Sequence, residues 1–375
     1  MHVSIVGAGL GGLTTAALLR RGGIDVTLYD RATPGGRART SEHAGALVNL
    51  GPHALYLRSA GVGVLRRLGI APTGGVPPTA GKVLRGGQLH DLPGGPWSFL
   101  RSTALSWAEK AVLPRWIALP PAAGLTVGAW LAGAPAGVRD LLSGLVRVSS
   151  YAEAPTEFDA ATAHRQLLRA FGGVRYLDGG WQQLVDALLP LAGPALSHDV
   201  QDLAELPPGP VVLAGPPALA RRLGVAVPDF VEARAACLDL ALASLPRPDA
   251  RFVLGLDTPL YLSEHGSHAR LGGTVVHVAR YLAPGESGAD ALAGLEAALD
   301  LAQPGWREQE RWRRFMPSLV VSSRVARPGE LVASTATVGG RVVHLVGDWV
   351  GEEAMLADRS FASAARAADT LLAAG

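Results

Sequence analysis

The first thirty residues constrain the fold most, because a glycine-rich turn and an acidic residue occur there at a characteristic distance. Residues 3–6 form a short apolar run, and the sequence GAGLGG follows directly at 7–12. A pyrophosphate binds where backbone N–H groups at a helix N-terminus approach it without intervening side chains. We therefore expect a turn at Gly7, close approach of a phosphate at Gly9 and tight helix packing at Gly12.

The segment after the turn completes this pattern. A helix over 11–21 is expected to end at Gly22, and a strand over 25–29 leads to Asp30. Asp30 lies roughly twenty residues beyond the glycines, where an acid accepts hydrogen bonds from the ribose hydroxyls of a dinucleotide. The order of strand, turn, helix, strand and acid predicts a Rossmann-like dinucleotide-binding unit.

A second glycine cluster separates two kinds of dinucleotide. An NAD-binding unit normally continues from its acid into another helix, whereas residues 34–36 (Pro-Gly-Gly) force a loop that brings Arg37 and Arg39 close to the phosphates. With this cluster and the nearby Thr40, the N-terminus resembles the superfamily of FAD-dependent amine oxidases, protoporphyrinogen oxidases and phytoene desaturases. The resemblance implies FAD rather than NAD.

Two further segments match the same superfamily. An apolar run at 342–346 ends in Gly347-Asp348, and a helix is expected from about 358 to 372. In the family, the acid of this pair binds the ribityl-phosphate part of FAD, and the helix N-terminus points at the flavin pyrimidine ring, where it stabilises negative charge. Taken alone, the Gly-Asp pair is also compatible with a helix-capping loop.

The middle segment resembles the family more loosely. Gly179-Gly180 precedes an expected helix, Val200 occupies the place of a valine that meets adenine, and 211–215 is expected to form a buried strand. The stretch between these points is shorter than in the family, which puts the role of Val200 in question. The glycine pair is equally compatible with an ordinary turn.

Together these matches imply a set of FAD contacts. Asn49 and Gly51 belong to it because residues 49–53 resemble a family segment, usually Asp-x-Gly, that runs near the isoalloxazine ring. No cysteine lies near the C-terminal motif, so FAD is expected to bind non-covalently. The expected cofactor-binding residues are Gly7, Gly9, Leu10, Gly11, Gly12, Asp30, Arg31, Gly36, Arg37, Asn49, Gly51, Val200, Ala214, Gly347, Asp348, Met355 and Leu356.

The reaction is less constrained than the cofactor. His53 is a candidate acid or base, although a histidine after Gly-Pro is also suited to a local hydrogen bond. Trp181, Tyr261 and Trp312 are candidates for the substrate pocket, with simple core packing as the alternative. Amine-oxidising relatives usually carry a lysine in the substrate domain, and none occurs between 111 and 375. We therefore favour dehydrogenation or isomerisation of a C–C bond in an apolar substrate, with amine oxidation and flavin binding without turnover as alternatives.

The expected fold is α/β, with the FAD-binding domain interleaved with an α+β substrate domain. Residues 1–75, 165–220 and 338–375 carry the flavin signals. Residues 76–164 are expected to form a hairpin and a helical cap, and 221–337 an antiparallel sheet with one helix near 290–302.

Composition excludes several partners. The chain of 375 residues has a net charge of +2 and only two lysines, Lys82 and Lys110, so we expect no nucleic-acid partner. Its single cysteine, Cys237, lies in an apolar run, permits no internal disulfide or thiolate cluster, and suits a cytoplasmic protein; no metal site is expected.

Two expectations concern the surroundings of the protein. The apolar segment 111–120, with Trp97 and Trp107 before it, is expected to form the helical cap of the pocket, with peripheral membrane contact as the alternative. The chain carries one dinucleotide fingerprint, because prolines at 216 and 217 remove amide donors from the other glycine turn considered. The electron acceptor is therefore expected to be oxygen, a quinone or another protein.

Overall fold

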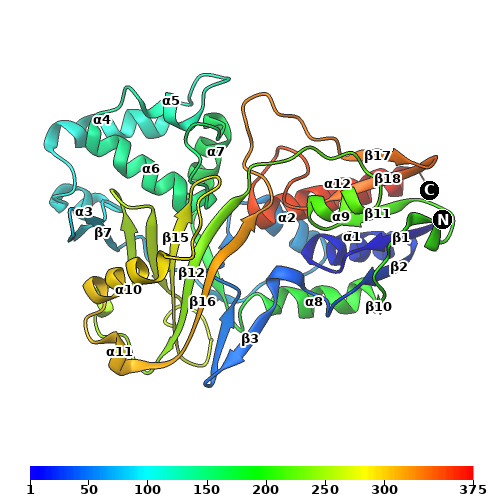
Figure 1. Cartoon of the computed structure of the whole chain (residues 1–375), viewed down its shortest axis with the longest axis horizontal. Coiled ribbons are helices and arrows are strands. Elements are labelled where there is room, and N and C mark those ends of the chain that lie inside the picture. The colour runs from blue at the N-terminus through cyan, green and yellow to red at the C-terminus, as the bar shows by residue number, and fades with distance from the viewer. Residues whose placement is uncertain (375) are drawn as a thin grey trace.

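The chain passes back and forth between two β-sheets in a computed structural model that describes residues 1–374 (Figure 1). The strands of the first sheet come from three separate parts of the sequence. In spatial order they are β10 (Ala195–Ser197), β2 (Asp25–Asp30), β1 (His2–Val6), β11 (Val211–Ala214), β18 (Arg341–Val346) and β17 (Thr335–Val338). All neighbours are parallel except β17 and β18, as the doubly wound architecture requires.

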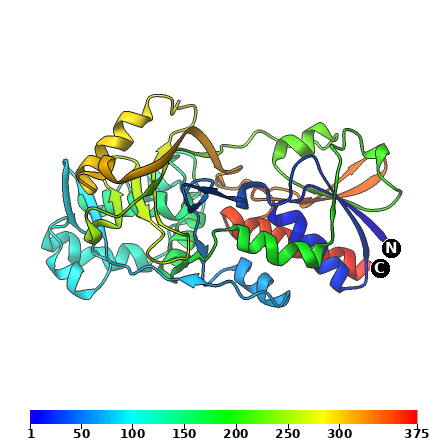
Figure 2. The same ribbon diagram turned by 90° about the horizontal axis from the view of Figure 1, so that it is seen from below.

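Helices cover one face of this first sheet. They are α1 (Leu10–Arg21), α8 (Gln182–Ala192), α12 (Leu356–Ala374) and α2 (Ala60–Arg67), and they share one apolar core with β1 and β2 (Figure 2). The short helix α9 (Pro217–Arg222) and irregular segments cover the other face. Covered on both faces, the central strands β1, β11 and β18 are mostly apolar.

The second sheet is mostly antiparallel and lies beside the first. Its order is β16 (Glu310–Ser322), β12 (Ala233–Leu242), β15 (Thr274–Leu282), β14 (Leu260–Glu264), β13 (Phe252–Gly255), β7 (Lys82–Arg85) and β8 (Gln88–Asp91). Only β7 and β13 pair in parallel. Thus the predicted hairpin of the first insert, β7–β8, extends the sheet of the second insert.

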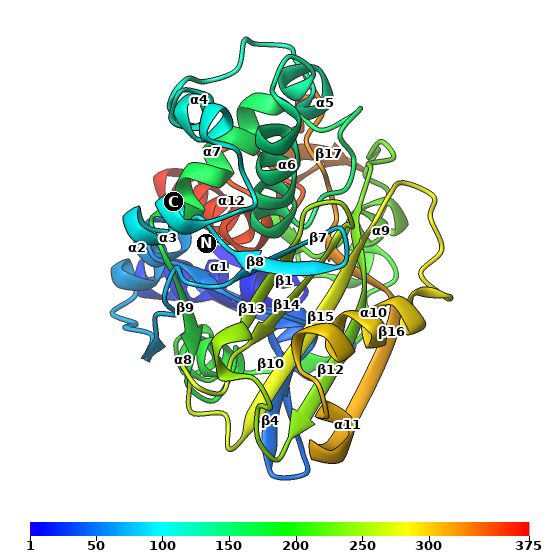
Figure 3. The ribbon, with the colours of Figure 1, turned by 90° about the vertical axis from the view of Figure 1, so that its left-hand side faces the viewer.

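Two layers of helices enclose this second sheet. One side packs on α10 (Ala291–Ala302) and the other on a helical layer (Figure 3). On β12, Cys237 faces the helical layer and Leu238 faces α10, which is the alternation expected of a strand buried on both sides. The helical layer consists of α3 (Pro96–Arg101), α4 (Trp107–Ala118), α5 (Val127–Leu131), α6 (Ala136–Ser150) and α7 (Ala160–Phe171).

Short elements connect the two units. The hairpin of β3 and β4 carries the chain from the first sheet toward the second, and β9 pairs with both β5 and β6. The bounds are β3 (Thr40–His43), β4 (Ala46–Asn49), β5 (Leu55–Tyr56), β6 (Gly74–Gly75), β9 (Val174–Leu177), α11 (Trp306–Gln309) and the 3₁₀ turns η1 (Gly36–Ala38), η2 (Leu203–Glu205) and η3 (Pro248–Ala250).

The interleaved α/β organisation predicted from the sequence is confirmed. The exact limits of the two domains stay predictions, because the sheets identify the strands of each unit but not where one domain ends. One long element, β16, was not predicted: its 13 residues carry charged and proline positions rather than a regular apolar alternation. It forms because its neighbour β12 supplies backbone partners along most of its length, with three shifts of register.

Candidate active site

The N-terminus of α1 opens onto a cavity of about 1310 Å³ that extends from the first sheet to the helical layer. Gly7 has φ of +106°, and a Cβ there would lie 2.2 Å from the carbonyl oxygen of Ala214. A Cβ on Gly12 would lie 1.8 Å from the carbonyl oxygen of Gly7. Gly7 thus forms the predicted turn in a backbone conformation that favours glycine, and Gly12 allows the predicted close packing of the helix.

Gly9 has a different reason to be glycine. A Cβ on Gly9 would meet no protein atom within 4 Å, although the residue lines the cavity. No side chain caps α1, whose N-cap is Gly9 itself. The N–H groups of the first turn of α1 and the loop at Gly36 thus border a space that protein side chains leave open, which is the property of an anion cradle.

Asp30 holds the turn in place from the end of β2. Its two carboxylate oxygens accept hydrogen bonds from the N–H of Ala8 (2.6 Å) and of Ala32 (2.8 Å). Asp30 also lines the cavity. Each carboxylate oxygen can accept a second hydrogen bond, so Asp30 remains able to bind a hydroxyl.

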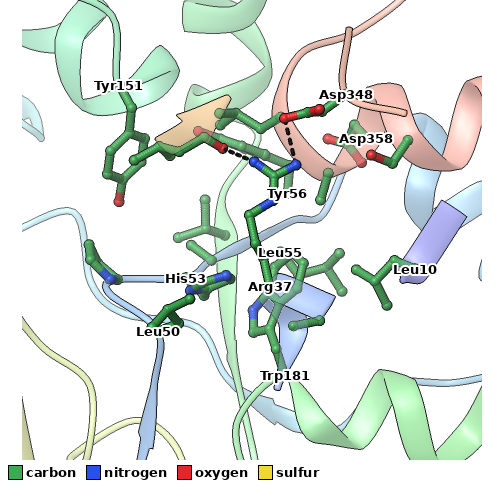
Figure 4. A pocket seen from close by; sticks show the side chains of 18 of the residues that line it. Leu10, Arg37, Leu50, His53, Leu55, Tyr56, Tyr151, Trp181, Asp348 and Asp358 are labelled. Carbon is green, nitrogen blue, oxygen red and sulfur yellow. Dashed lines mark hydrogen bonds and ion pairs between the residues drawn. The ribbon is translucent and has the colours of Figure 1, made fainter. Parts of the chain in front are cut away.

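The two ends of the sequence meet in this cavity. Arg37 donates a hydrogen bond to Asp348 across a sequence separation of 311 residues, at 2.8 Å (Figure 4). Asp348 is buried and also accepts a bond from the N–H of Ser323 (2.9 Å). Arg37 additionally donates to the carbonyl oxygen of Val321 (3.1 Å). The structure therefore brings Gly9, Arg37 and Asp348 to one cavity, as the convergence of the motifs requires.

Most of the predicted site residues line the cavity. Those that line it are Gly7, Gly9, Leu10, Gly11, Asp30, Arg31, Gly36, Arg37, His53, Trp181, Val200, Ala214, Tyr261, Gly347, Asp348 and Leu356. Those that lie behind its wall or elsewhere are Gly12, Asn49, Gly51, Met355 and Trp312.

Trp312 lies outside the cavity wall, contrary to the expectation that it lines the substrate pocket. Its ring stacks on His43 with a centroid distance of 4.0 Å, and the guanidinium of Arg314 lies 5.5 Å from it. On β16 it faces the tip of the β3–β4 hairpin, which holds it away from the pocket. Its role is packing, the alternative considered for it from the sequence.

The other residues outside the cavity wall support it. The side-chain oxygen of Asn49 accepts bonds from the hydroxyl of Thr40 (2.8 Å) and the N–H of Trp181 (2.9 Å), so it joins three segments of the wall. Met355 is fully buried in the core below the helical layer, just before the start of α12. The cavity-facing residue at this helix start is Leu356.

His53 lies where the cofactor cradle meets the rest of the cavity, and Figure 4 shows it near Trp181 and Arg37. Its Nδ1 is 3.1 Å from the carbonyl oxygen of Gly51 and so carries the proton, which leaves Nε2 as an acceptor. Burial lowers the pKa of His53 to about 4, with the hydrogen bond to Gly51 opposing it. His53 is therefore neutral at physiological pH.

A buried carboxylate behind His53 was missed in the sequence. Asp239 on β12 accepts hydrogen bonds from Nδ1 of His277 (2.7 Å), from Arg314 (2.7 Å) and from the N–H of Gly51 (3.3 Å). Burial disfavours its charge, but His277 and Arg314 outweigh this effect and hold the pKa of Asp239 below its ordinary value. Asp239 thus fixes the Gly51 peptide, whose carbonyl oxygen in turn holds His53.

The rest of the cavity forms an apolar arm between the second sheet and the helical layer. Its wall is built mainly from α4, α6 and α7, which form the expected helical cap. The apolar lining side chains of these helices are Leu113, Ile117, Leu141, Leu145, Val148, Leu167 and Phe171. The chain's two lysines lie elsewhere: Lys82 pairs with Asp91 (2.9 Å), and Lys110 donates to the carbonyl oxygen of Leu100 (2.9 Å).

Comparison with known proteins agrees with this geometry. Residues 5–64 match the sequence profile of the NAD(P)-binding Rossmann-like domain. A stretch of 82 residues is 43% identical to hydroxyneurosporene desaturase from Rubrivivax gelatinosus, covering 20% of this chain and 16% of that protein. The match thus spans less than a fifth of this curated relative.

Two solved structures share the fold over nearly the whole chain. An oxidoreductase from Methanosarcina mazei superposes with a TM-score of 0.75 at 18% identity, covering 98% of this chain and all of the other. A double mutant of putrescine oxidase gives a TM-score of 0.73 at 17% identity, with 99% of both chains covered. These comparisons confirm the resemblance to the amine oxidase, protoporphyrinogen oxidase and phytoene desaturase superfamily and its fold.

Proposed function

We propose that this chain is an FAD-dependent oxidoreductase that dehydrogenates, or isomerises, a C–C bond of an apolar small molecule. The observation that carries the proposal is one continuous cavity with two chemically different ends. One end is lined by Gly9, Arg37 and Asp348, and the other is the apolar arm below α4, α6 and α7.

The residues at the first end suit a non-covalently bound FAD. The open space at Gly9 fits a pyrophosphate at the start of α1, and Asp30 suits the adenosine ribose. Asp348 and the start of α12 suit the ribityl and pyrimidine parts. Cys237 is buried in β12 away from the cavity wall, which disfavours a thioether link. Bound flavin supplies a hydride acceptor.

We assign to His53 the role of the base that removes a proton from the substrate. Dehydrogenation of a C–C bond removes one hydrogen as a hydride and the neighbouring one as a proton, and a double bond forms between the two carbons. Nε2 of His53 is an unprotonated acceptor at neutral pH, because its pKa is about 4. It is a weak base, which suffices when loss of the hydride makes the neighbouring C–H acidic. An isomerisation uses the same atom to take and return a proton.

Amine oxidation is the second candidate, favoured by the shared fold of putrescine oxidase. Against it, Lys82 and Lys110 are held in contacts away from the cavity. Stopped-flow bleaching of bound flavin against amines and isoprenoid hydrocarbons separates the two. Bleaching by hydrocarbons supports the proposal, bleaching by amines alone supports amine oxidation, and bleaching by neither supports flavin binding without turnover. Repeating the reoxidation with oxygen and with a soluble quinone identifies the electron acceptor.

Contact with a lipid surface belongs to the same proposal, because an apolar substrate partitions into membranes. Within residues 1–374, no helix combines the length and apolar composition needed to cross a bilayer. Trp97 on α3 and Trp107 on α4 are nevertheless 79% and 69% exposed. Both helices lie at the end of the molecule opposite the two termini (Figure 1). On α4, Leu113 and Ile117 line the apolar arm. Such exposed tryptophans are suited to a membrane interface.

Vesicle binding tests this contact. We expect the protein to sediment with vesicles of phosphatidylcholine and phosphatidylglycerol, and W97S/W107S to reduce the bound fraction several-fold. The matched control is L331S, because Leu331 is 80% exposed but lies in the loop before β17. A wild-type protein that stays in the supernatant, or an L331S variant that loses binding equally, contradicts the contact.

A further inference from the structure

Two tyrosines from opposite walls of the apolar arm meet through their hydroxyl groups. Tyr151 follows α6 in the helical layer, and Tyr261 lies on β14 of the second sheet. Both line the cavity, and their hydroxyl oxygens are hydrogen-bonded to each other. Their rings meet edge to face at a centroid distance of 5.9 Å. The pair places a polar group in a wall that is otherwise mostly apolar.

The two tyrosine hydroxyls carry one more hydrogen than their mutual hydrogen bond uses. Each tyrosine hydroxyl has one hydrogen to donate, and a bond between two hydroxyls consumes one of the two hydrogens. Among residues 1–374, neither hydroxyl has a hydrogen-bond partner besides the other. One hydroxyl hydrogen therefore remains available at the cavity wall.

Three polar side chains near the pair are engaged in other contacts. The hydroxyl of Tyr56 donates to the carbonyl oxygen of Ser149 (2.7 Å). The hydroxyl of Ser149 donates to the carbonyl oxygen of Val146 (3.1 Å). Arg147 is held by Glu153 (3.2 Å) and by the carbonyl oxygen of Leu256 (3.1 Å). What the tyrosine pair offers to the arm is thus a neutral hydroxyl donor.

The backbone at Tyr151 adds an independent observation. Tyr151 ends α6 with φ of +61°, a left-handed conformation that glycine adopts far more easily. A glycine here would satisfy the turn but would remove the side chain from the cavity. Burial also raises the pKa of both Tyr151 and Tyr261 well above the ordinary value, so both stay protonated donors.

We propose that Tyr151 and Tyr261 form a substrate subsite that donates a hydrogen bond to a neutral oxygen, such as a carbonyl or hydroxyl, on an otherwise apolar substrate. The inference deepens the proposed function and rests on it, because it takes the arm to hold the substrate. It narrows the substrate class from pure hydrocarbons to apolar molecules with one oxygen-bearing group.

The test compares two ligands of nearly identical shape, 2-undecanone and 2-methyl-1-undecene, which differ in an oxygen acceptor and a methylene group. Their dissociation constants are measured by displacement of Nile red from the purified protein. The ratio of the two constants is compared between variants, so that the different hydration of the ligands cancels. We expect Y151F/Y261F to lower the preference for the ketone by roughly 3- to 10-fold.

The single variants Y151F and Y261F test whether one hydroxyl is enough to donate the hydrogen bond. In Y151F or Y261F alone, the remaining hydroxyl keeps a free hydrogen, so each should retain most of the preference. The matched control is Y281F: Tyr281 stacks on Tyr261 at 5.7 Å, is equally buried, and lies outside the cavity wall. An unchanged ratio in the double variant, an equal loss in Y281F, or no binding of either ligand to the wild type overturns the inference.

A second measurement does not depend on affinity. The infrared carbonyl stretch of bound ¹³C-labelled 2-undecanone should lie at lower frequency in the wild type and in Y281F than in Y151F/Y261F. An identical frequency in all three overturns the subsite. Both measurements use resting protein without turnover, so a failure of the proposed flavin chemistry appears separately, as absent flavin or absent bleaching.

Discussion

At the scale of single residues, the site depends on groups that are held by neighbours remote in the sequence. Gly9 borders open space, and Arg37 reaches Asp348 at the other end of the chain. His53 is held by Gly51, and Gly51 by Asp239. The chemistry assigned to His53 therefore depends on a carboxylate that does not line the cavity.

Replacing Asp239 tests this dependence. The carboxylate of Asp239 accepts hydrogen bonds from donors on His277, Arg314 and Gly51. In D239N the side-chain amide keeps one acceptor oxygen, and its NH₂ group faces a donor where the second carboxylate oxygen accepted a bond. We expect D239N to lower the free energy of unfolding by about 3 kcal/mol. In ¹⁵N-histidine NMR spectra, the single Nδ1-protonated form of His53 should become a mixture of tautomers.

The control for this variant is Q303L. Gln303 is another buried polar side chain, which bonds to Arg247 and Ala250 beside α10. Q303L should lower the free energy of unfolding without changing the NMR signals of His53. These signals are assigned as the ones that are missing from the spectrum of H53Q. An unaltered His53 tautomer in D239N would show that Asp239 does not position this histidine.

The sequence predicted the glycines and acids of the cradle because each acts within a local motif. Gly7, Gly9 and Asp30 lie within one strand–helix–strand unit, whose spacing determines where they meet. Asp239 and Arg314 lie 75 residues apart and meet only through the pairing of β12 with β16. No spacing in the sequence indicates that contact, and the misplaced Trp312 belongs to the same unpredicted strand.

At the scale of elements, α12 connects the cavity to α2. Asp358 in the first turn of α12 accepts a hydrogen bond from the N–H of Gly61 (3.1 Å) and lines the cavity. Burial raises its pKa to about 6, although the contacts with Ser59 and Gly61 oppose this shift. Burial of the ionised carboxylate therefore costs stability at neutral pH, and the hydrogen bond from Gly61 offsets only part of this cost.

Asp358 gives a pH-dependent prediction. Between about pH 4 and 6 the folded protein keeps a proton that the unfolded chain loses, so this residue lowers the free energy of unfolding as pH rises. D358N keeps the acceptor for Gly61 without the charge. The measurement is urea unfolding without added FAD. At pH 8 the free energy of unfolding should be higher for D358N than for wild type. This difference between the two proteins should be larger at pH 8 than at pH 4, by up to about 3 kcal/mol. A pH-independent difference contradicts the assignment.

Elements with a local pattern were predictable, and those defined by pairing were not. The unit of β1, α1 and β2, the strand β18 and the helix α10 lie within a few residues of their expected limits. The addition of β7 and β8 to the second sheet was not predicted, because β7 pairs with β13 across about 170 intervening residues. A strand's partner is a property of the whole fold.

At the scale of the whole molecule, the interleaved chain builds one cavity from both units. The first sheet contributes the cradle and the second contributes the apolar arm, so neither unit alone forms the complete site. His53 lies at the junction of the two parts. The proposed function uses this arrangement, because it lets a cofactor bound by one unit face a substrate bound by the other.

The most direct test is the flavin content of the reconstituted protein. Wild type, G9V and G133V are incubated with FAD, desalted and heated, and the released flavin is measured by its absorbance. The Cβ of a valine at position 9 would project into the cradle with no protein atom within 4 Å. Gly133 is exposed and also has open space around its Cβ. We expect about one FAD per chain in wild type and G133V and almost none in G9V, and we expect all three proteins to remain folded. Wild-type protein that retains no FAD, or G9V protein that retains a full complement, would contradict it.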